Sequence, residues 1–143
     1  MSADKLYTSD MLAAAVSLAA FPPLPDAGRH AEARSQTCGS TLQMDVDHDA
    51  EGRIRSIGMK VNACAVGQAS AAIFAKHAGG FGLEELFRVK SALEAWLGGE
   101  GELPDWPEIE LVAAAKDYPA RHGAMLLSWN AAISALSSTE PSG

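Results

Sequence analysis

The sequence is short of basic residues, and this shortage excludes one large class of partners. It has 11 lysines and arginines against 18 aspartates and glutamates, which gives a formal net charge of −7 at pH 7. Proteins that bind a nucleic-acid backbone need clustered basic side chains to displace counterions from the phosphates. No basic stripe of this kind occurs along the chain. We therefore expect a protein that does not bind nucleic acid.

Long apolar runs are also absent. No uninterrupted apolar segment reaches the roughly 20 residues that a membrane-spanning helix needs. The opening residues MSADKLYTSD carry acids where a secretory leader would have basic and then apolar residues. The sequence therefore predicts a cytoplasmic protein with no membrane association.

Cysteine is scarce, because Cys38 and Cys64 are the only 2 among 143 residues. A chain of this length can bury a core without disulfides, and cytoplasmic thiols normally stay reduced. The pair is then either two buried thiols or two metal-binding or reactive residues. The composition, 48% hydrophobic and 20% charged, is that of a globular protein. We expect one domain over residues 1–143 with a disordered tail from about residue 137.

Alternating polar and apolar residues predict a β-hairpin in the first half of the chain. Residues 41–47 place Leu42, Met44 and Val46 on one face, and a turn over 48–52 leads to a second alternating run over 53–63. The interval between Ile54 and Ile57 breaks the alternation and indicates a bulge near Ser56. Before the hairpin, an alanine-rich helix follows the capping pair Ser9-Asp10, and residues 22–37 form a loop or an edge strand.

Helical patterns dominate the second half. We expect helices over 65–78, 83–97, 108–118 and 119–136, the last opened by proline. The apolar stripe of the second of these helices contains Leu83, Leu86, Phe87, Leu93, Trp96 and Leu97. A helix, a small antiparallel sheet and then several helices make an α+β fold.

The predicted hairpin brings the two cysteines to the same end of the sheet. Each lies about 12 to 14 positions from the turn, and opposed positions in a hairpin are close neighbours. Cys64 also begins a helix, where unpaired backbone N–H groups and the helix dipole favour a thiolate. Thiolates bind metals and attack sulfur, so this pair is the candidate functional site.

Three segments carry a resemblance to a known family: TCGSTLQMDV, GRIRSIGMKVNACAVGQASAAIF and YPARHGAMLLSW. They resemble the iron–sulfur cluster assembly scaffolds of the IscU, SufU and NifU N-terminal family, over most of residues 5–136. The resemblance implies a three-stranded antiparallel sheet flanked by helices, of the SufE/NifU-like kind. It also implies a site of three cysteines and an aspartate that holds zinc or an assembling iron–sulfur cluster. A cysteine desulfurase would supply sulfur, and recipient apo-proteins would take the cluster.

The sequence departs from this family pattern at two of the four ligand positions. Cys38 and Cys64 take the places of the first two family cysteines, and they are the candidate cluster-binding and metal-binding residues. Ser40 stands where the family has aspartate, and Ala124 where it has the third cysteine. We treat Ser40 and His122 as accessory metal ligands. Two chains could combine their cysteines in a homodimer.

Three functions remain open from the sequence. The first is a scaffold-like protein that binds metal or cluster, or accepts sulfur, without turning over a substrate as an enzyme does. The second is a sulfur acceptor or transferase of the SufE kind, and the third is an interaction domain that has lost metal binding. Other charged groups, including His30, His77 and the turn acids from Asp45 to Glu51, are interpreted as solvated.

Overall fold

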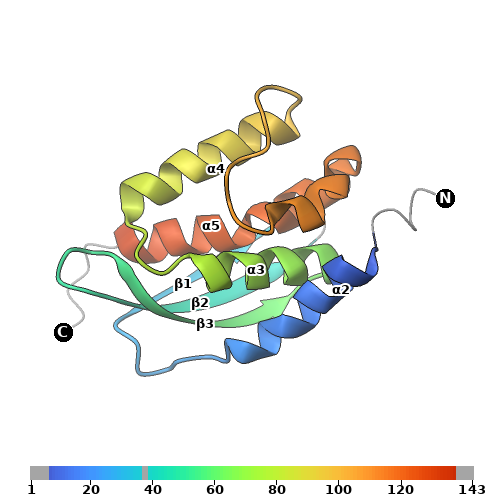
Figure 1. Ribbon diagram of the computed structural model, residues 1–143. Coiled ribbons are helices and arrows are strands. Elements are labelled where there is room, and N and C mark those ends of the chain that lie inside the picture. Colours follow the sequence, from blue (N-terminus) through green and yellow to red (C-terminus); the bar gives the residue numbers. More distant parts are fainter. Residues whose placement is uncertain (1–6, 37–38, 138–143) are drawn as a thin grey trace.

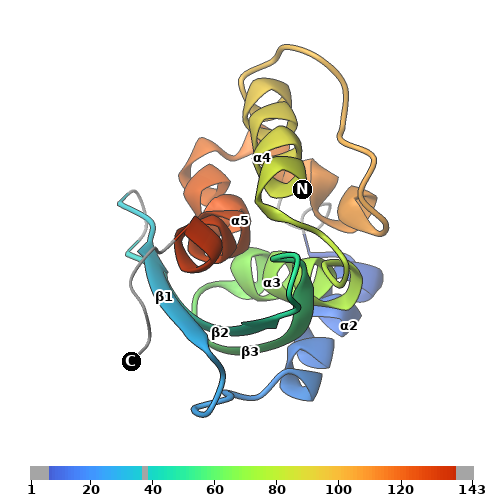
Figure 2. The same ribbon diagram turned by 90° about the vertical axis from the view of Figure 1, so that its left-hand side faces the viewer.

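A three-stranded antiparallel sheet with helices packed on one face forms the centre of the molecule (Figures 1 and 2). The computed structural model describes residues 7–36 and 39–137. The sheet has the order β1 (Arg29–Arg34), β2 (Thr41–His48) and β3 (Ile54–Asn62). This arrangement is α+β, as the sequence predicts.

The predicted hairpin is confirmed, together with its bulge. β2 and β3 pair antiparallel from Thr41↔Asn62 to Asp47↔Ser56, and the register then shifts so that His48 pairs with Ile54. The shift leaves Arg55 as the extra residue of β3, next to the position expected for the bulge. Leu42, Met44 and Val46 are fully buried, as their alternation requires.

β1 shows that the segment before the hairpin contains an edge strand. It pairs antiparallel with β2, from Arg29↔Val46 to Arg34↔Thr41. Its burial alternates between half-buried residues, which are Arg29, Ala31 and Ala33, and exposed polar residues, which are His30, Glu32 and Arg34. The three-stranded sheet implied by the family resemblance is therefore present.

The helices form two layers above the sheet. α3 (Ala65–His77) and α5 (His122–Ser137) pack over the strands, and α4 (Leu83–Leu97) lies on the far side of α5 (Figure 2). α2 (Ser9–Val16), followed by the 3-10 turn η1 (Ser17–Ala20), packs beside α3. Thr8 caps α2 by accepting a hydrogen bond from the Met11 amide at 3.1 Å, so the cap lies one residue before the predicted position.

One predicted helix has a different form. Residues 109–117 make a 3-10 helix, η2 (Ile109–Asp117), followed by the short η3 (Pro119–Arg121). The buried residues of η2, which are Ile109, Val112 and Ala115, recur every third position. This spacing matches the three-residue turn of a 3-10 helix, which aligns them on one side.

An aromatic cluster forms the centre of the core. The rings of Phe74 and Trp106 stack with centroids 5.4 Å apart, and Trp129 meets Phe74 edge-on at 5.0 Å. All three tryptophans are buried. Phe87 belongs to the apolar stripe of α4 but is 47% exposed, whereas Leu86 and Leu93 of the same stripe are fully buried.

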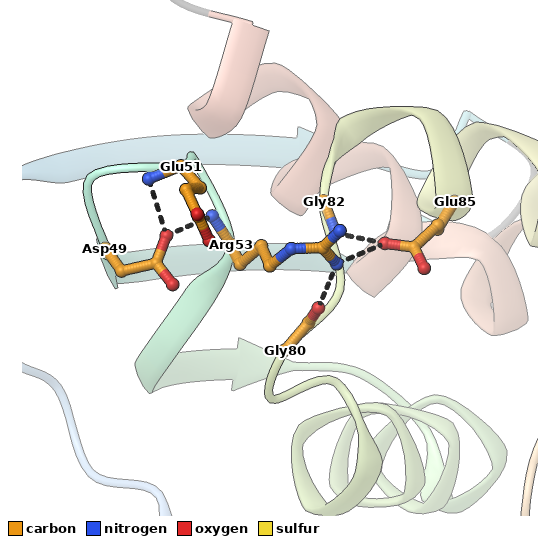
Figure 3. Close-up of polar contacts among 6 residues, drawn as sticks. All are labelled: Asp49, Glu51, Arg53, Gly80, Gly82 and Glu85. Carbon is orange, nitrogen blue, oxygen red and sulfur yellow. Dashed lines mark hydrogen bonds and ion pairs between the residues drawn. The ribbon is translucent and has the colours of Figure 1, made fainter.

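The hairpin turn is held to the loop between α3 and α4, at the opposite end of the sheet from Cys64. The Arg53 guanidinium donates hydrogen bonds to the Gly80 carbonyl at 2.8 Å and the Glu85 carboxylate at 3.0 Å (Figure 3). Asp49 closes the turn by accepting hydrogen bonds from the amides of Glu51 and Arg53.

None of the helices within residues 7–36 and 39–137 is long and apolar enough to cross a bilayer.

Candidate functional site

The candidate site lies where β2 begins and β3 ends. Thr41 and Asn62 form the first pair of the β2–β3 ladder. Ser40 immediately precedes this pair on one strand, and Cys64 follows it by two residues on the other. The fold therefore brings the Ser40 and Cys64 positions to one end of the sheet.

Cys64 is the N-cap residue of α3, as the sequence predicts. Its backbone is extended, with φ −67° and ψ 173°, and its side chain makes no capping hydrogen bond. The residue is partly buried and packs against the edge of the core. Within the part of the chain that the structure describes, Cys64 is not in a disulfide.

Ser40 lies in the tight connection between β1 and β2. Its carbonyl accepts the Ser35 amide at 2.8 Å, and the Ser35 carbonyl accepts the Gly39 amide at 3.0 Å. Gly39 has φ +72°, a left-handed conformation that glycine adopts readily. Ser40 is only 5% exposed. Cys38 lies outside the described residues, so its predicted pairing with Cys64 remains a prediction.

Ala124 occupies the third family cysteine position and lies beside the first turn of α3. A Cβ atom placed on Gly67 would lie 3.3 Å from the Ala124 Cβ, so the two helices are in close contact there. Ala124 is 1% exposed. The fold thus keeps the position next to the helix that Cys64 begins, but a methyl group has no lone pair to offer a metal.

His122 begins α5 and has a hydrogen-bond partner. Its Nε2 lies 2.8 Å from the Lys116 carbonyl, which can only accept, so Nε2 carries the proton and Nδ1 holds the lone pair. Residues two apart on a helix do not share a face, and Ala124 is the one that faces α3. His122 could therefore ligate only through Nδ1, from a different side of α5.

The candidate ligands Cys64, Ser40 and His122 do not make a complete metal site within one chain. Among residues 7–36 and 39–137, no group of three or more histidine, cysteine, aspartate or glutamate side chains is arranged to hold a metal ion. Structural zinc needs four ligands and common clusters need four thiolates. Cys64 supplies one thiol, and even with Cys38 the chain has two.

Gln68 is a residue of this site that sequence reasoning missed. Its side-chain Nε2 donates to the Ala63 carbonyl at 2.9 Å, and its backbone amide donates to the Cys64 carbonyl at 2.9 Å. Gln68 is the one large polar side chain between Ala65 and Ala75, in a segment otherwise made of small and apolar residues. A single large polar residue in such a segment is the sequence signal that could have identified Gln68.

The groups interpreted as solvated make specific contacts away from this site. His30 pairs with Asp45 at 2.7 Å on the exposed face of the sheet. His77 pairs with Glu108 at 2.7 Å, and the hydrogen bond from His77, with the nearby charge of Lys76, lowers the pKa of Glu108. These contacts are hydrogen-bonded pairs that join elements of the fold.

Comparison with known proteins gives matches at the level of structure. No family model and no curated protein sequence matches the chain. The NifU-like N-terminal protein of Brucella abortus superposes with a TM-score of 0.86 at 26% identity, over 95% of each chain. A protein described as an iron–sulfur cluster assembly scaffold for the SUF system, from Fervidobacterium islandicum AW-1, superposes with a TM-score of 0.77 at 21% identity. That match covers 92% of this chain and 97% of the other.

These similarities extend over nearly the whole chain and agree with the three sequence segments that carry the resemblance. In this chain the strands lie in the order β1-β2-β3, Cys64 caps α3, and Ala124 lies beside Gly67 of that helix. The chain has the fold of these NifU-like and SufU-type proteins, and this similarity supports the resemblance to the IscU, SufU and NifU N-terminal family that its sequence carries.

Proposed function

We propose that this protein is a scaffold-like component of iron–sulfur cluster assembly in the cytoplasm that accepts sulfur and binds metal or cluster through Cys38 and Cys64. The observation that supports it most is the position of Cys64. It begins α3 at the end of the sheet, with Ser40 and Ala124 at neighbouring family ligand positions. The fold relatives include a protein described as a scaffold of this kind. The protein would act as a carrier and not as a turnover enzyme.

The sulfur step in this proposal is a thiol–persulfide exchange with a cysteine desulfurase. The Cys64 thiolate attacks the outer sulfur of the donor's persulfide and forms a new S–S bond. The S–S bond of the donor breaks, and the donor cysteine leaves as a thiolate. Electrons balance within the exchange, so it needs no further oxidant or reductant.

The metal step treats iron, a cluster or zinc as cargo that passes to recipient apo-proteins. One chain supplies two thiols, so a four-thiolate cluster requires the cysteines of two chains. Ser40 and His122 are accessory ligands in this proposal. With so few strong donors in each chain, we expect cargo to be held weakly and released readily.

The test is metal and sulfide analysis of protein purified without oxygen and then reconstituted with iron, cysteine and a desulfurase. We expect iron and sulfide to be bound by a dimer, with about one four-thiolate cluster for two chains. Cys64→Ser should abolish binding, while Ser91→Ala, on the exposed side of α4, should not change it. Absence of both metal and persulfide on the unaltered chain would contradict the proposal.

One observation favours the second function, that of a sulfur acceptor of the SufE kind. The third family ligand position is a buried methyl group packed against α3, and this arrangement does not hinder a site that needs only one reactive thiol. Persulfide on Cys64 in the absence of bound iron, with no iron uptake on reconstitution, would select this function over the scaffold.

A further inference from the structure

Gln68 holds both peptide groups that flank Cys64. Its side-chain amide donates to the carbonyl of Ala63, which belongs to the peptide before Cys64. Its backbone amide donates to the carbonyl of Cys64, which belongs to the peptide after it. One residue thus restrains the chain on either side of the cysteine.

This restraint acts on the short connection between β3 and α3. The ladder ends with the pair Thr41↔Asn62, and the helix begins at Ala65. Only Ala63 and Cys64 join them, and the Cys64 side chain makes no capping bond. The backbone bond from Gln68 to Cys64 is the ordinary first bond of a helix. The side-chain bond to Ala63 is the additional one, and it depends on the identity of residue 68.

Gln68 also faces a groove between α2 and the sheet. The groove has a volume of about 400 Å³ and is lined mostly by apolar residues, including Val16, Phe21 and Met59. Gln68 thus lies at the edge of an apolar groove, and its side-chain amide is bound to the Ala63 carbonyl. The hydrogen bond to Ala63 is the side-chain contact that orients this carboxamide.

We propose that Gln68 is a positioning residue for Cys64, whose carboxamide holds the 63–64 connection so that the sulfur is presented in one orientation to a sulfur donor. The proposal rests on the proposed function of Cys64 as a sulfur acceptor. Loss of the carboxamide donor should free the connection. The Cys64 thiol should then react faster with small reagents, but accept sulfur more slowly from a protein donor that requires one orientation.

The first test measures the rate at which methyl methanethiosulfonate modifies Cys64, read by peptide-resolved mass spectrometry so that Cys38 is counted separately. Gln68→Met keeps the size of the side chain and removes the donor, and should raise the rate about threefold or more. Gln43→Met, on the exposed face of β2, is the matched control and should leave the rate unchanged. Circular dichroism checks that each variant is folded. Equal rates for the unaltered chain and Gln68→Met would overturn the proposal.

A second variant separates hydrogen bonding from packing. Gln68→Glu has a donor only when its carboxyl group is protonated, and an ordinary glutamate titrates near about pH 4.3. Its rate relative to the unaltered chain should fall towards one as the pH is lowered from 7.5 to 4.5, whereas the ratio for Gln68→Met should stay constant. If the two ratios stay constant together, the carboxamide donor has no positioning role.

The last measurement is persulfide transfer from a cysteine desulfurase to Cys64. Gln68→Met should accept sulfur more slowly than the unaltered chain, although its thiol reacts faster with the small reagent. Faster or equal transfer would overturn the positioning role. If the unaltered chain accepts no sulfur at all, the proposed function fails, and the two reagent measurements still decide whether Gln68 restrains Cys64.

Discussion

The hydroxyl of Ser70 in α3 donates a hydrogen bond to the main-chain carbonyl of Met125 in α5, at 2.8 Å and out of contact with solvent. Met125 follows Ala124, so this bond sets the two helices against each other beside the third family ligand position. The position of Ala124 relative to the helix that Cys64 begins therefore depends on a polar contact within the core.

Ser70→Ala should lower the free energy of unfolding by about 1 kcal/mol, the usual net worth of a buried neutral hydrogen bond. Urea unfolding followed by circular dichroism measures this change. Ser91→Ala, on the exposed side of α4, is the control and should be neutral within error. Equal stability of the two variants would show that the Ser70 bond contributes nothing to the packing of α3 on α5.

Gly67→Ala should destabilise the protein by about 1–3 kcal/mol through overpacking. The added methyl group would lie 2.7 Å from the Ala63 Cβ and 3.3 Å from the Ala124 Cβ. Each Cβ is attached directly to the backbone, so neither can move away without a backbone shift. Alanine has the higher helix propensity by up to about 1 kcal/mol, so a loss of stability would come from tertiary contacts. Gly79→Ala, where a Cβ meets nothing within 4 Å, is the matched control for thermal unfolding. A gain of stability at position 67 would contradict the close contact.

Ala124→Cys combined with Ser40→Asp should increase the iron or zinc retained per chain after gel filtration. The substitutions add a thiol beside the helix that Cys64 begins and a carboxylate at the start of β2, which are donors that both metals accept. Metal analysis under anaerobic conditions measures the change. Ala135→Cys, a buried residue in the last turn of α5, tests whether any added thiol has the same effect. An equal increase in retained metal with Ala135→Cys would show that the effect does not depend on the location of the thiol at position 124.

Glu108 should contribute stability that is lost at acid pH. The hydrogen bond from His77 and the charge of Lys76 lower its pKa below the ordinary 4.5. A carboxyl group with a lowered folded-state pKa stabilises the protein above its unfolded value and loses that contribution as the pH falls through the folded value. Glu108→Gln should therefore flatten the fall in melting temperature below about pH 4.5. Glu110→Gln, on the exposed side of η2, is the control. An unchanged acid slope in Glu108→Gln would show that the pair with His77 does not stabilise the fold.

Local patterns were enough to predict most of the secondary structure. Leu42, Met44 and Val46 alternate with polar residues. Successive side chains of a strand point to opposite faces, so this two-residue period predicts a strand with one buried face. The break between Ile54 and Ile57 indicated the bulge for the same reason. η2 was missed as a 3-10 helix because three-residue and four-residue spacings overlap in a short alanine-rich segment.

The exposure of single side chains and the identity of their hydrogen-bond partners were harder to predict. Phe87 fits the apolar stripe of α4, but its exposure depends on how far α5 reaches around that helix. His77 and Glu108 are a pair because the chain returns from α4 to the end of α3, a path that no local pattern records. Gln68 bonds to a carbonyl five residues earlier, where a helix would not normally place its partner.

The sequence by itself determined the β2–β3 hairpin, the order of the helices, the position of Cys64 at the start of α3 and the absence of a third cysteine. These properties follow from short-range spacing and residue identity. Only the tertiary structure decided that Ala124 lies beside Gly67, that His122 bonds to Lys116 and that the Gln68 side chain bonds to the Ala63 carbonyl. Contacts between helices depend on which side chains are small enough to let the backbones approach, and on where the chain turns between them. That packing assembles the site from separate segments.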